Sequence, residues 1–146
     1  MSRKLKIAII SIYPFPIGMA ASNRILAYSK GFVENGGEVD VFITLPLHRI
    51  NSEPKQEDFG NYCGINYQYT SGRYSHRLKI IRALSILSGY RFIKAILGTS
   101  KIIHKKNIVN KYDCMIISSD KIIQLFSYSK LAKLLKIKSI FIFDEY

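Results

Sequence analysis

The sequence predicts an α/β domain with a parallel sheet of about five strands and helices on both faces. Short runs rich in isoleucine and valine alternate with longer stretches of helical periodicity. The strongest runs lack polar alternation, as expected for strands buried on both faces. The first strand, helix and second strand fit into about forty residues, the size of a βαβ unit. With 146 residues, the chain is long enough for one domain with a sizeable core.

The first βαβ unit is bounded by two apolar strands, predicted at Leu5–Ser11 and Val39–Thr44. Pro14 and Pro16 end the first strand because proline lacks the backbone N–H that a sheet needs. Ser22 has the side chain of an N-cap and marks the predicted start of the helix. Apolar residues then recur at helical spacing until a Gly-Gly pair closes the helix. A right-handed crossover of this kind makes the two strands parallel.

The rest of the chain adds further strands and helices. A polar stretch at Leu45–Gly64 is predicted to hold neither. Beyond it the sequence predicts a third strand, a long helix, a fourth strand, a further helix and a fifth strand. These elements are predicted at Ile65–Thr70, Ser75–Asn107, Asp113–Ser118, Lys121–Leu135 and Ser139–Phe143. In open α/β sheets ligands lie beyond the carboxyl ends of the strands, so side chains that follow these strands are candidate site residues.

The chain is strongly basic, with 22 Lys and Arg against 10 Asp and Glu and a net charge of +12. Such an excess favours polyanions, which include nucleic acid, anionic membrane surfaces and phosphorylated ligands. No RNA-binding motif accompanies it, so nucleic acid is not the expected partner. The two cysteines, Cys63 and Cys114, have neither zinc-site nor redox spacing. Their scarcity, and an N-terminal apolar run too short for a signal peptide, predict a cytoplasmic protein.

The turn after the first strand is the candidate ligand site. Gly18 lets the backbone approach a ligand, and the helix start that follows offers N–H groups without partners inside the helix. Arg24 adds a guanidinium that pairs well with phosphate or carboxylate. The alternative is an ordinary βα turn with a solvated Arg24. The chain contains no GxGxxG, GxxxxGKS/T or GxSxG, which argues against classical dinucleotide binding, P-loop chemistry and the α/β-hydrolases.

The stretch KIAIISIYPFPIGMAASNRILAYSKGFVENGGEVDVFIT resembles the start of glycosyltransferase family 4. Members of that family begin with a strand, a Pro-Pro-x-Gly-Gly-Ala-like loop, a helix with an arginine, and a Gly-His-Glu-Val-x-Val strand. The matching positions here are Pro14, Pro16, Gly18, Ala20, Arg24 and the segment GGEVDVF. The closing FIFDEY is similar to the Asp-Glu-x-Pro step of such enzymes. Met19 departs from the pattern at the second glycine, and Ser118-Ser119-Asp120 stands where many relatives have a histidine.

The resemblance implies a Rossmann-like three-layer domain, the N-terminal half of a GT-B architecture. Residues 1–146 would be the acceptor-side domain, and the C-terminal donor-binding domain would be absent from this chain. The full-length enzyme would be a hexosyltransferase-type glycosyltransferase that moves a sugar from a nucleotide-sugar to a saccharide or lipid-linked acceptor in bacterial cell-envelope polysaccharide synthesis. It would need no cofactor and no metal. The fragment alone would be inactive, whether a truncated product or one half that pairs with a complementary chain.

The same resemblance implies roles for residues at the predicted strand ends. The loop that would hold donor phosphates and acceptor comprises Gly18, Met19, Ala20 and Arg24. Side chains after the fourth and fifth strands are acceptor-side candidates, and these are Ser119, Asp120, Asp144 and Glu145. No catalytic residue is assigned, because the three histidines, His48, His76 and His104, lie away from the position that the family uses.

One interval, residues 59–112, is basic and contains no acidic residue. Its apolar side chains fall roughly on one helical arc and several lysines roughly opposite, which is typical of helices that lie on anionic membranes. The candidate membrane-surface residues are Arg77, Lys79, Arg82, Lys94, Lys101 and Lys105. A core helix with a solvated basic face explains the same pattern. The alternative function is a non-catalytic Rossmann-like module that binds the inner face of an anionic membrane or a partner chain.

Overall fold

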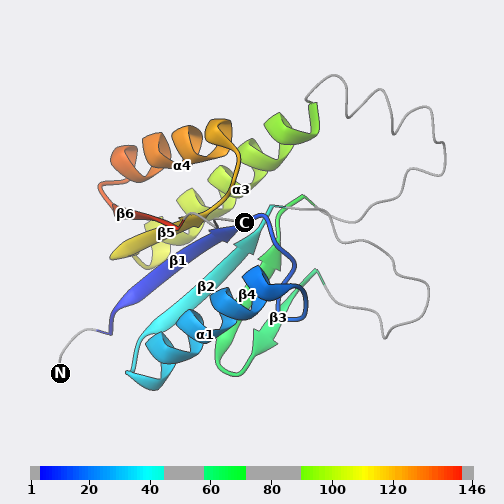
Figure 1. Ribbon diagram of the computed structural model, residues 1–146. Coiled ribbons are helices and arrows are strands. Elements are labelled where there is room, and N and C mark those ends of the chain that lie inside the picture. Colours follow the sequence, from blue (N-terminus) through cyan, green and yellow to red (C-terminus); the bar gives the residue numbers. More distant parts are fainter. Residues whose placement is uncertain (1–3, 45–57, 72–89, 143–146) are drawn as a thin grey trace.

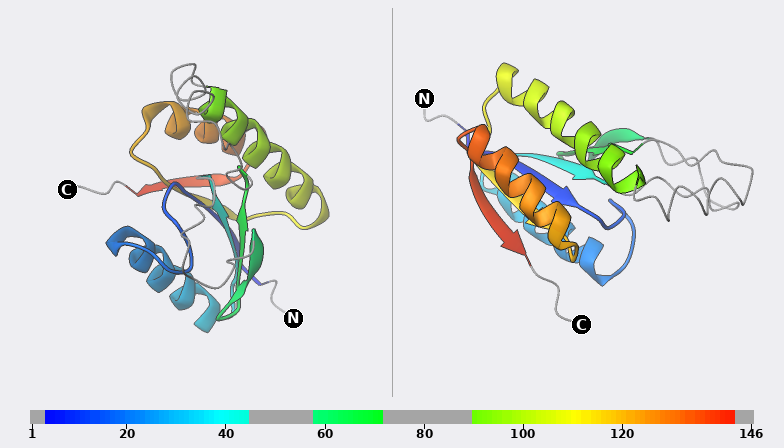
Figure 2. Two further views of the ribbon diagram at one scale, coloured as in Figure 1. Left: turned by 90° about the vertical axis from the view of Figure 1, so that its right-hand side faces the viewer. Right: turned by 90° about the horizontal axis from the view of Figure 1, so that it is seen from above.

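The computed structural model describes residues 4–44, 58–71 and 90–142. A six-stranded sheet of order β3-β4-β2-β1-β5-β6 lies between α1 on one face and α3 and α4 on the other (Figure 1, Figure 2). The predicted three-layer α/β architecture is confirmed. The elements are β1 (Lys6–Ser11), α1 (Ala20–Glu34), β2 (Glu38–Ile43), β3 (Phe59–Tyr62), β4 (Ile65–Tyr69), α3 (Tyr90–Val109), β5 (Cys114–Ser118), α4 (Ile122–Leu134) and β6 (Lys138–Ile142).

The strand count differs from the prediction because β3 lies in the stretch that was predicted to hold no element. Five strands are parallel, whereas β3 pairs antiparallel with β4 at the sheet edge. The hairpin turns at Cys63 and Gly64, which both have positive φ, 52° and 80°. Two consecutive positive φ angles are the geometry of the tight turns that suit hairpins. The Asn61 side chain steadies this turn by accepting the Gly64 N–H at 3.1 Å.

The start of α1 also differs from the prediction, which made Ser22 the N-cap. The helix begins at Ala20, Met19 is the N-cap, and Ser22 lies inside the first turn, where it is buried. The predicted end of the helix is confirmed. Gly36 has φ 82°, and the N–H groups of Gly36 and Gly37 bond to carbonyls of the last turn. This is the Schellman arrangement, in which glycine takes the left-handed position without a steric cost.

The core has two halves, one on each side of the sheet. In β1, Ile7 and Ile9 face the half that α1 covers, whereas Ala8 and Ile10 face the half under α3 and α4. All four are at most 1% exposed. Burial on both faces explains why the sequence of this strand is continuously apolar. The described part of the chain holds no helix with the length and apolarity to cross a bilayer.

Candidate functional site

The central strands β1 and β5 lie side by side, and the chain leaves them toward opposite faces of the sheet. β1 leads into α1 on one face, and β5 leads into α4 on the other (Figure 2). The two strands end together at the register pair Ser11 and Ser118, where the Ile12 N–H donates to the Ser118 carbonyl at 3.4 Å. Ligands of open α/β sheets bind at such a reversal of strand order, beyond the carboxyl ends. This edge is therefore the candidate site.

The loop after β1, residues 12–19, is held in place by a tyrosine from β4. The Tyr69 hydroxyl accepts the Phe15 N–H at 3.1 Å and donates to the Phe15 carbonyl at 3.0 Å. The Phe15 ring is fully buried and lies 5.8 Å from the ring of Tyr67. At the start of the loop, the Ser11 hydroxyl accepts the Tyr13 N–H at 2.8 Å. These contacts fix the backbone that leads to Gly18.

Gly18 sits against the first turn of α1, and only glycine fits there. A Cβ atom at this position would lie 2.4 Å from Ser22 Oγ and 2.9 Å from Pro14 Cγ. Ser22 is fully buried, and its hydroxyl has no hydrogen-bond partner among the described residues. A buried hydroxyl without a partner costs free energy, so a ligand that bonds to it would recover that cost.

The N-terminus of α1 points its backbone N–H groups at the same edge of the sheet. Within the described ranges, no side chain caps the helix at Met19, and its first turn holds no acidic residue. Its first N–H groups and the positive end of its dipole favour an anion. Arg24 is exposed one turn further along. Arg24 follows the buried Ser22 by two residues, which places it on the outer face of α1 near the same helix end.

The segment after β5 forms the opposite side of this edge. Ser119 is buried, donates its hydroxyl to Gln124 Oε1 at 2.8 Å and accepts the Lys121 N–H at 3.1 Å. Ser119 therefore fixes the start of α4 and is committed to internal bonds. Asp120 is exposed and pairs with the Lys121 ammonium at 2.9 Å. Of these two acceptor-side candidates, Asp120 is the one whose side chain reaches solvent.

The remaining sequence-predicted residues divide into two groups. Lys94, Lys101 and Lys105 are exposed on α3, on the helix face that the sequence predicts. The others lie outside the described residues, and these are Arg77, Lys79, Arg82, Asp144 and Glu145. The structure thus brings together the Gly18 loop, the start of α1 and Asp120 at one edge, and places the three lysines on a separate surface.

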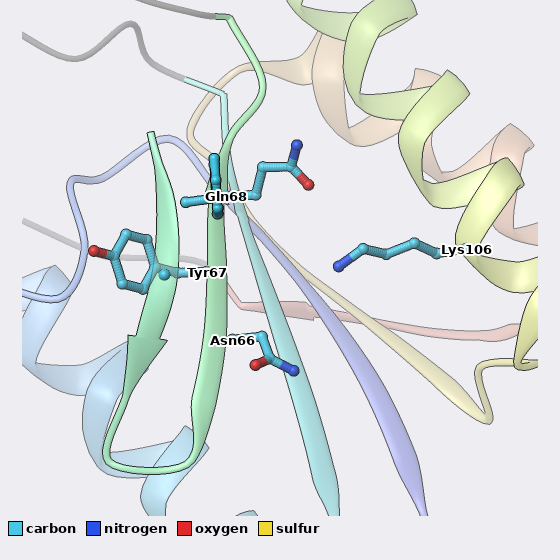
Figure 3. Close-up of a pocket in the computed structure, with 6 residues that line it drawn as sticks. Asn66, Tyr67, Gln68 and Lys106 are labelled. Carbon is cyan, nitrogen blue, oxygen red and sulfur yellow. The ribbon is translucent and has the colours of Figure 1, made fainter. Parts of the chain in front are cut away.

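Away from this edge, a hollow of about 410 Å³ lies between β4 and the C-terminal half of α3. Asn66 and Gln68 point from β4 toward the Lys106 side chain, whereas Tyr67 points to the other side of the strand (Figure 3). The residues that line it are Phe59, Gly60, Asn66, Tyr67, Gln68 and Lys106. Two of its polar side chains, Asn66 and Lys106, already interact with Asp40. The hollow is therefore a weaker candidate ligand site than the edge at Gly18.

The polar groups beneath that hollow meet at Asp40. The Tyr112 hydroxyl donates to Asp40 Oδ2 at 2.5 Å, Asn66 Nδ2 donates to Oδ1 at 3.1 Å, and Lys106 Nζ lies 3.6 Å from Oδ1. Burial, and then the bond to Asp40, raise the pKa of Tyr112 well above its usual range. Three partners satisfy this buried carboxylate, so the cluster ties β2, β4, α3 and the start of β5 together.

Two features of the site were not predicted from the sequence. Tyr69 was assigned only to a strand, although its hydroxyl anchors Phe15 from 54 residues away. Ser22 was predicted as a cap, although its hydroxyl lies buried beneath Gly18. The close spacing of Gly18 and Ser22 across a helix start was the available signal for the second feature. The bond between Tyr69 and Phe15 had no local sequence signal, because the two residues are 54 positions apart.

The geometry defines the class of the protein as an open α/β domain of Rossmann-like strand order with an anion-favouring edge. No group of three histidine, cysteine, aspartate or glutamate side chains able to hold a metal occurs in the described part of the chain. Comparisons with protein-family models, curated proteins and solved structures find no match to this chain.

Proposed function

We propose that this chain is the acceptor-side half of a family 4-like glycosyltransferase. The complete enzyme moves a sugar from a nucleotide-sugar to a saccharide or lipid-linked acceptor in cell-envelope polysaccharide synthesis. The proposal draws on the resemblance of residues 5–44 and on a Rossmann-like sheet whose strand order reverses between β1 and β5. In this assignment the Gly18 loop and α1 contribute to holding the donor phosphates across the cleft.

One observation carries the proposal: the uncapped start of α1 lies beside Gly18 and the unpartnered Ser22 hydroxyl. Backbone N–H groups, a helix dipole and a hydroxyl donor at one place suit a group with several anionic oxygens, such as a diphosphate. Arg24 adds a donor pair of the geometry that phosphate accepts. On the other side of the edge, Asp120 offers carboxylate oxygens to the hydroxyl groups of a saccharide.

A titration followed by amide NMR tests this assignment. Adding a nucleoside diphosphate should shift the amide signals of residues 18–24, whereas the matching nucleoside without phosphates should not. The Gly18→Ala variant should lose the shifts, because its methyl group would enter the space of Ser22 Oγ. Gly31→Ala is the matched control, since no atom lies within 4 Å of a Cβ at Gly31. An unchanged spectrum at millimolar diphosphate would overturn the role of the loop.

The chain by itself should not transfer sugar, because in the proposed enzyme the nucleotide-sugar binds in a cleft between two domains, and this chain supplies only the acceptor-side domain. Turnover of a nucleotide-sugar by the 146-residue chain would contradict the two-half assignment. The second candidate function is a non-catalytic module that binds an anionic membrane or a partner chain. The exposed lysines of α3 favour it, and it requires no diphosphate at Gly18. The NMR titration separates the two candidates for that reason.

A further inference from the structure

Helix α4 carries apolar side chains on its outer side as well as on the side that it packs inward. Gln124, Tyr128 and Ala132 pack against the sheet and α3, as the inner side of such a helix should. The opposite side exposes large apolar side chains, and these are Ile122 at 80%, Ile123 at 68%, Phe126 at 61% and Leu134 at 76%. Exposed apolar side chains gathered on one side of a helix commonly mark a contact site, so this outer side is a candidate contact surface.

Lysines lie among these apolar side chains. Lys130 and Lys133 are exposed on α4, and Lys130 Nζ lies 4.4 Å from the centre of the Phe126 ring. No acidic residue occurs between Lys121 and Ile142. The contact surface on α4 is therefore positively charged as well as apolar.

Helix α3 continues the same surface. It exposes Ile93 at 57%, Leu97 at 64% and Ile108 at 72%, at helical spacings that place them on one side. The exposed Lys94, Lys101 and Lys105 lie on this side too. The two helices contact each other and form one layer over the sheet (Figure 2). We call this layer's exposed side the α3–α4 surface, defined by the residues Ile93, Lys94, Leu97, Lys101, Lys105, Ile108, Ile122, Ile123, Phe126, Lys130, Lys133 and Leu134.

We propose that the α3–α4 surface docks on an anionic lipid bilayer. Neither helix carries an acidic residue, which gives the surface one sign of charge across two elements. Lysine stems extend past apolar neighbours so that the ammonium groups reach head groups while isoleucine, leucine and phenylalanine enter the acyl boundary. A protein partner would need an acidic surface that also covers the apolar side chains, whereas an anionic bilayer supplies both properties everywhere.

The position of the surface brings the candidate site close to the bilayer. Ile122 and Ile123 begin α4 two residues after Asp120, at the same sheet edge as the Gly18 loop. A protein docked through the start of α4 therefore holds that edge beside the lipid head groups. This consequence rests on the proposed function, and within it favours an acceptor linked to lipid over a free saccharide. Binding to the bilayer itself does not depend on the proposed function.

Vesicle co-sedimentation tests the docking surface. The chain should bind vesicles with a large share of phosphatidylglycerol and should not bind pure phosphatidylcholine. Binding should weaken as salt shortens the screening length from roughly 30 Å at 0.01 M to about 8 Å at 0.15 M. The paired change Lys101→Gln/Lys130→Gln should weaken binding about five-fold per lysine, the equivalent of about 1 kcal/mol each. The matched control is Lys4→Gln/Lys30→Gln, because these lysines lie before β1 and on α1, away from the surface.

A second pair of variants tests the apolar part. Ile122→Ser/Phe126→Ser should reduce vesicle binding by about tenfold or more, since apolar area no longer leaves water. Phe59→Ser, at an equally exposed side chain on β3, should leave binding unchanged. The proposal is wrong if the chain does not bind anionic vesicles at low salt, or if both lysine pairs lose binding equally. It is also wrong if Ile122→Ser/Phe126→Ser only dissociates a dimer, which sedimentation velocity would reveal. The diphosphate titration is independent of each of these results.

Discussion

Ser22 Oγ occupies the space that a side chain at Gly18 would need, with 2.4 Å between the hydroxyl oxygen and the position of a Cβ atom. The hydroxyl is buried and lacks a partner in the described ranges of the chain. A buried hydroxyl without an internal bond costs stability, and the hydroxyls of Ser29 and Tyr128 share this condition. In the proposed function, the missing bond of Ser22 is made with a ligand phosphate.

The Ser22→Ala variant should therefore separate stability from binding. We expect its free energy of unfolding to stay equal or to rise by about 0.5–1 kcal/mol, because an unsatisfied buried hydroxyl is removed. Its affinity for a nucleoside diphosphate should fall by about five-fold or more, the value of one lost hydrogen bond. Chemical denaturation and the NMR titration measure the two quantities. A clear loss of stability would show that the hydroxyl has an internal role.

The Tyr69→Phe variant should loosen the loop that leads to Gly18. The change removes the hydroxyl that bonds to both backbone groups of Phe15 and leaves the packing of the ring in place. We expect a loss of about 1–3 kcal/mol in unfolding free energy, because two buried backbone groups lose their partner. Diphosphate affinity should fall as well. Tyr28→Phe, on the exposed part of α1, is the control and should change neither quantity.

The Tyr112→Phe variant should be destabilised without losing affinity at Gly18. Tyr112 donates a short bond to the buried Asp40, and bonds to charged groups contribute about 1.5–3 kcal/mol. The change leaves Asp40 with Lys106 and Asn66. Thermal unfolding measures the loss, and an unchanged diphosphate titration would confirm that this cluster is structural. Equal effects on stability and on affinity would contradict the separation of the two sites.

The end of α4 offers a substitution that should stabilise the protein. Lys136 has φ 55°, and the Ile137 N–H bonds to the Ala132 carbonyl at 2.9 Å, as in the glycine-terminated α1. Lys136→Gly should raise the unfolding free energy by about 0.5–1 kcal/mol, because glycine takes this conformation without strain. The converse change, Gly36→Ala, should lower it by about 1 kcal/mol. Urea denaturation of the two variants checks the opposite signs.

Alkaline pH should destabilise the protein through its buried tyrosines. Burial raises the pKa of Tyr128 from 10.0 to about 12. The folded protein therefore retains a proton that the unfolded chain loses above pH 10, so stability is complete below pH 10 and falls as pH rises toward 12. The Tyr128→Phe variant should show a shallower decline over this window by about 1–3 kcal/mol. Denaturation at pH 9 and pH 11.5 measures the loss of unfolding free energy in both proteins. An equal loss in Tyr128→Phe and in the unchanged chain would show that Tyr128 does not cause it.

The sequence predicted the parallel strands well because burial on both faces leaves a continuous apolar run, as in Ile7–Ile10 and Met115–Ile117. It missed β3 because the hairpin turns at Cys63, a residue that rarely takes a positive φ and so gives no turn signal. The candidate loop was predicted because Gly18 follows two prolines within a few residues. The bond between Tyr69 and Phe15 joins segments that are 54 residues apart, and no periodicity encodes such a contact.

The loop after β1 is bonded to β4, which is separated from β1 in the sheet by β2. The hydrogen bonds between Tyr69 and Phe15 therefore connect the loop directly to the β3–β4 hairpin. A displacement of the hairpin at the sheet edge would therefore move the backbone before Gly18, even though the two lie on different elements. A movement of the β3–β4 hairpin at the sheet edge and ligand binding at the Gly18 loop would thus be coupled through the hydroxyl of Tyr69.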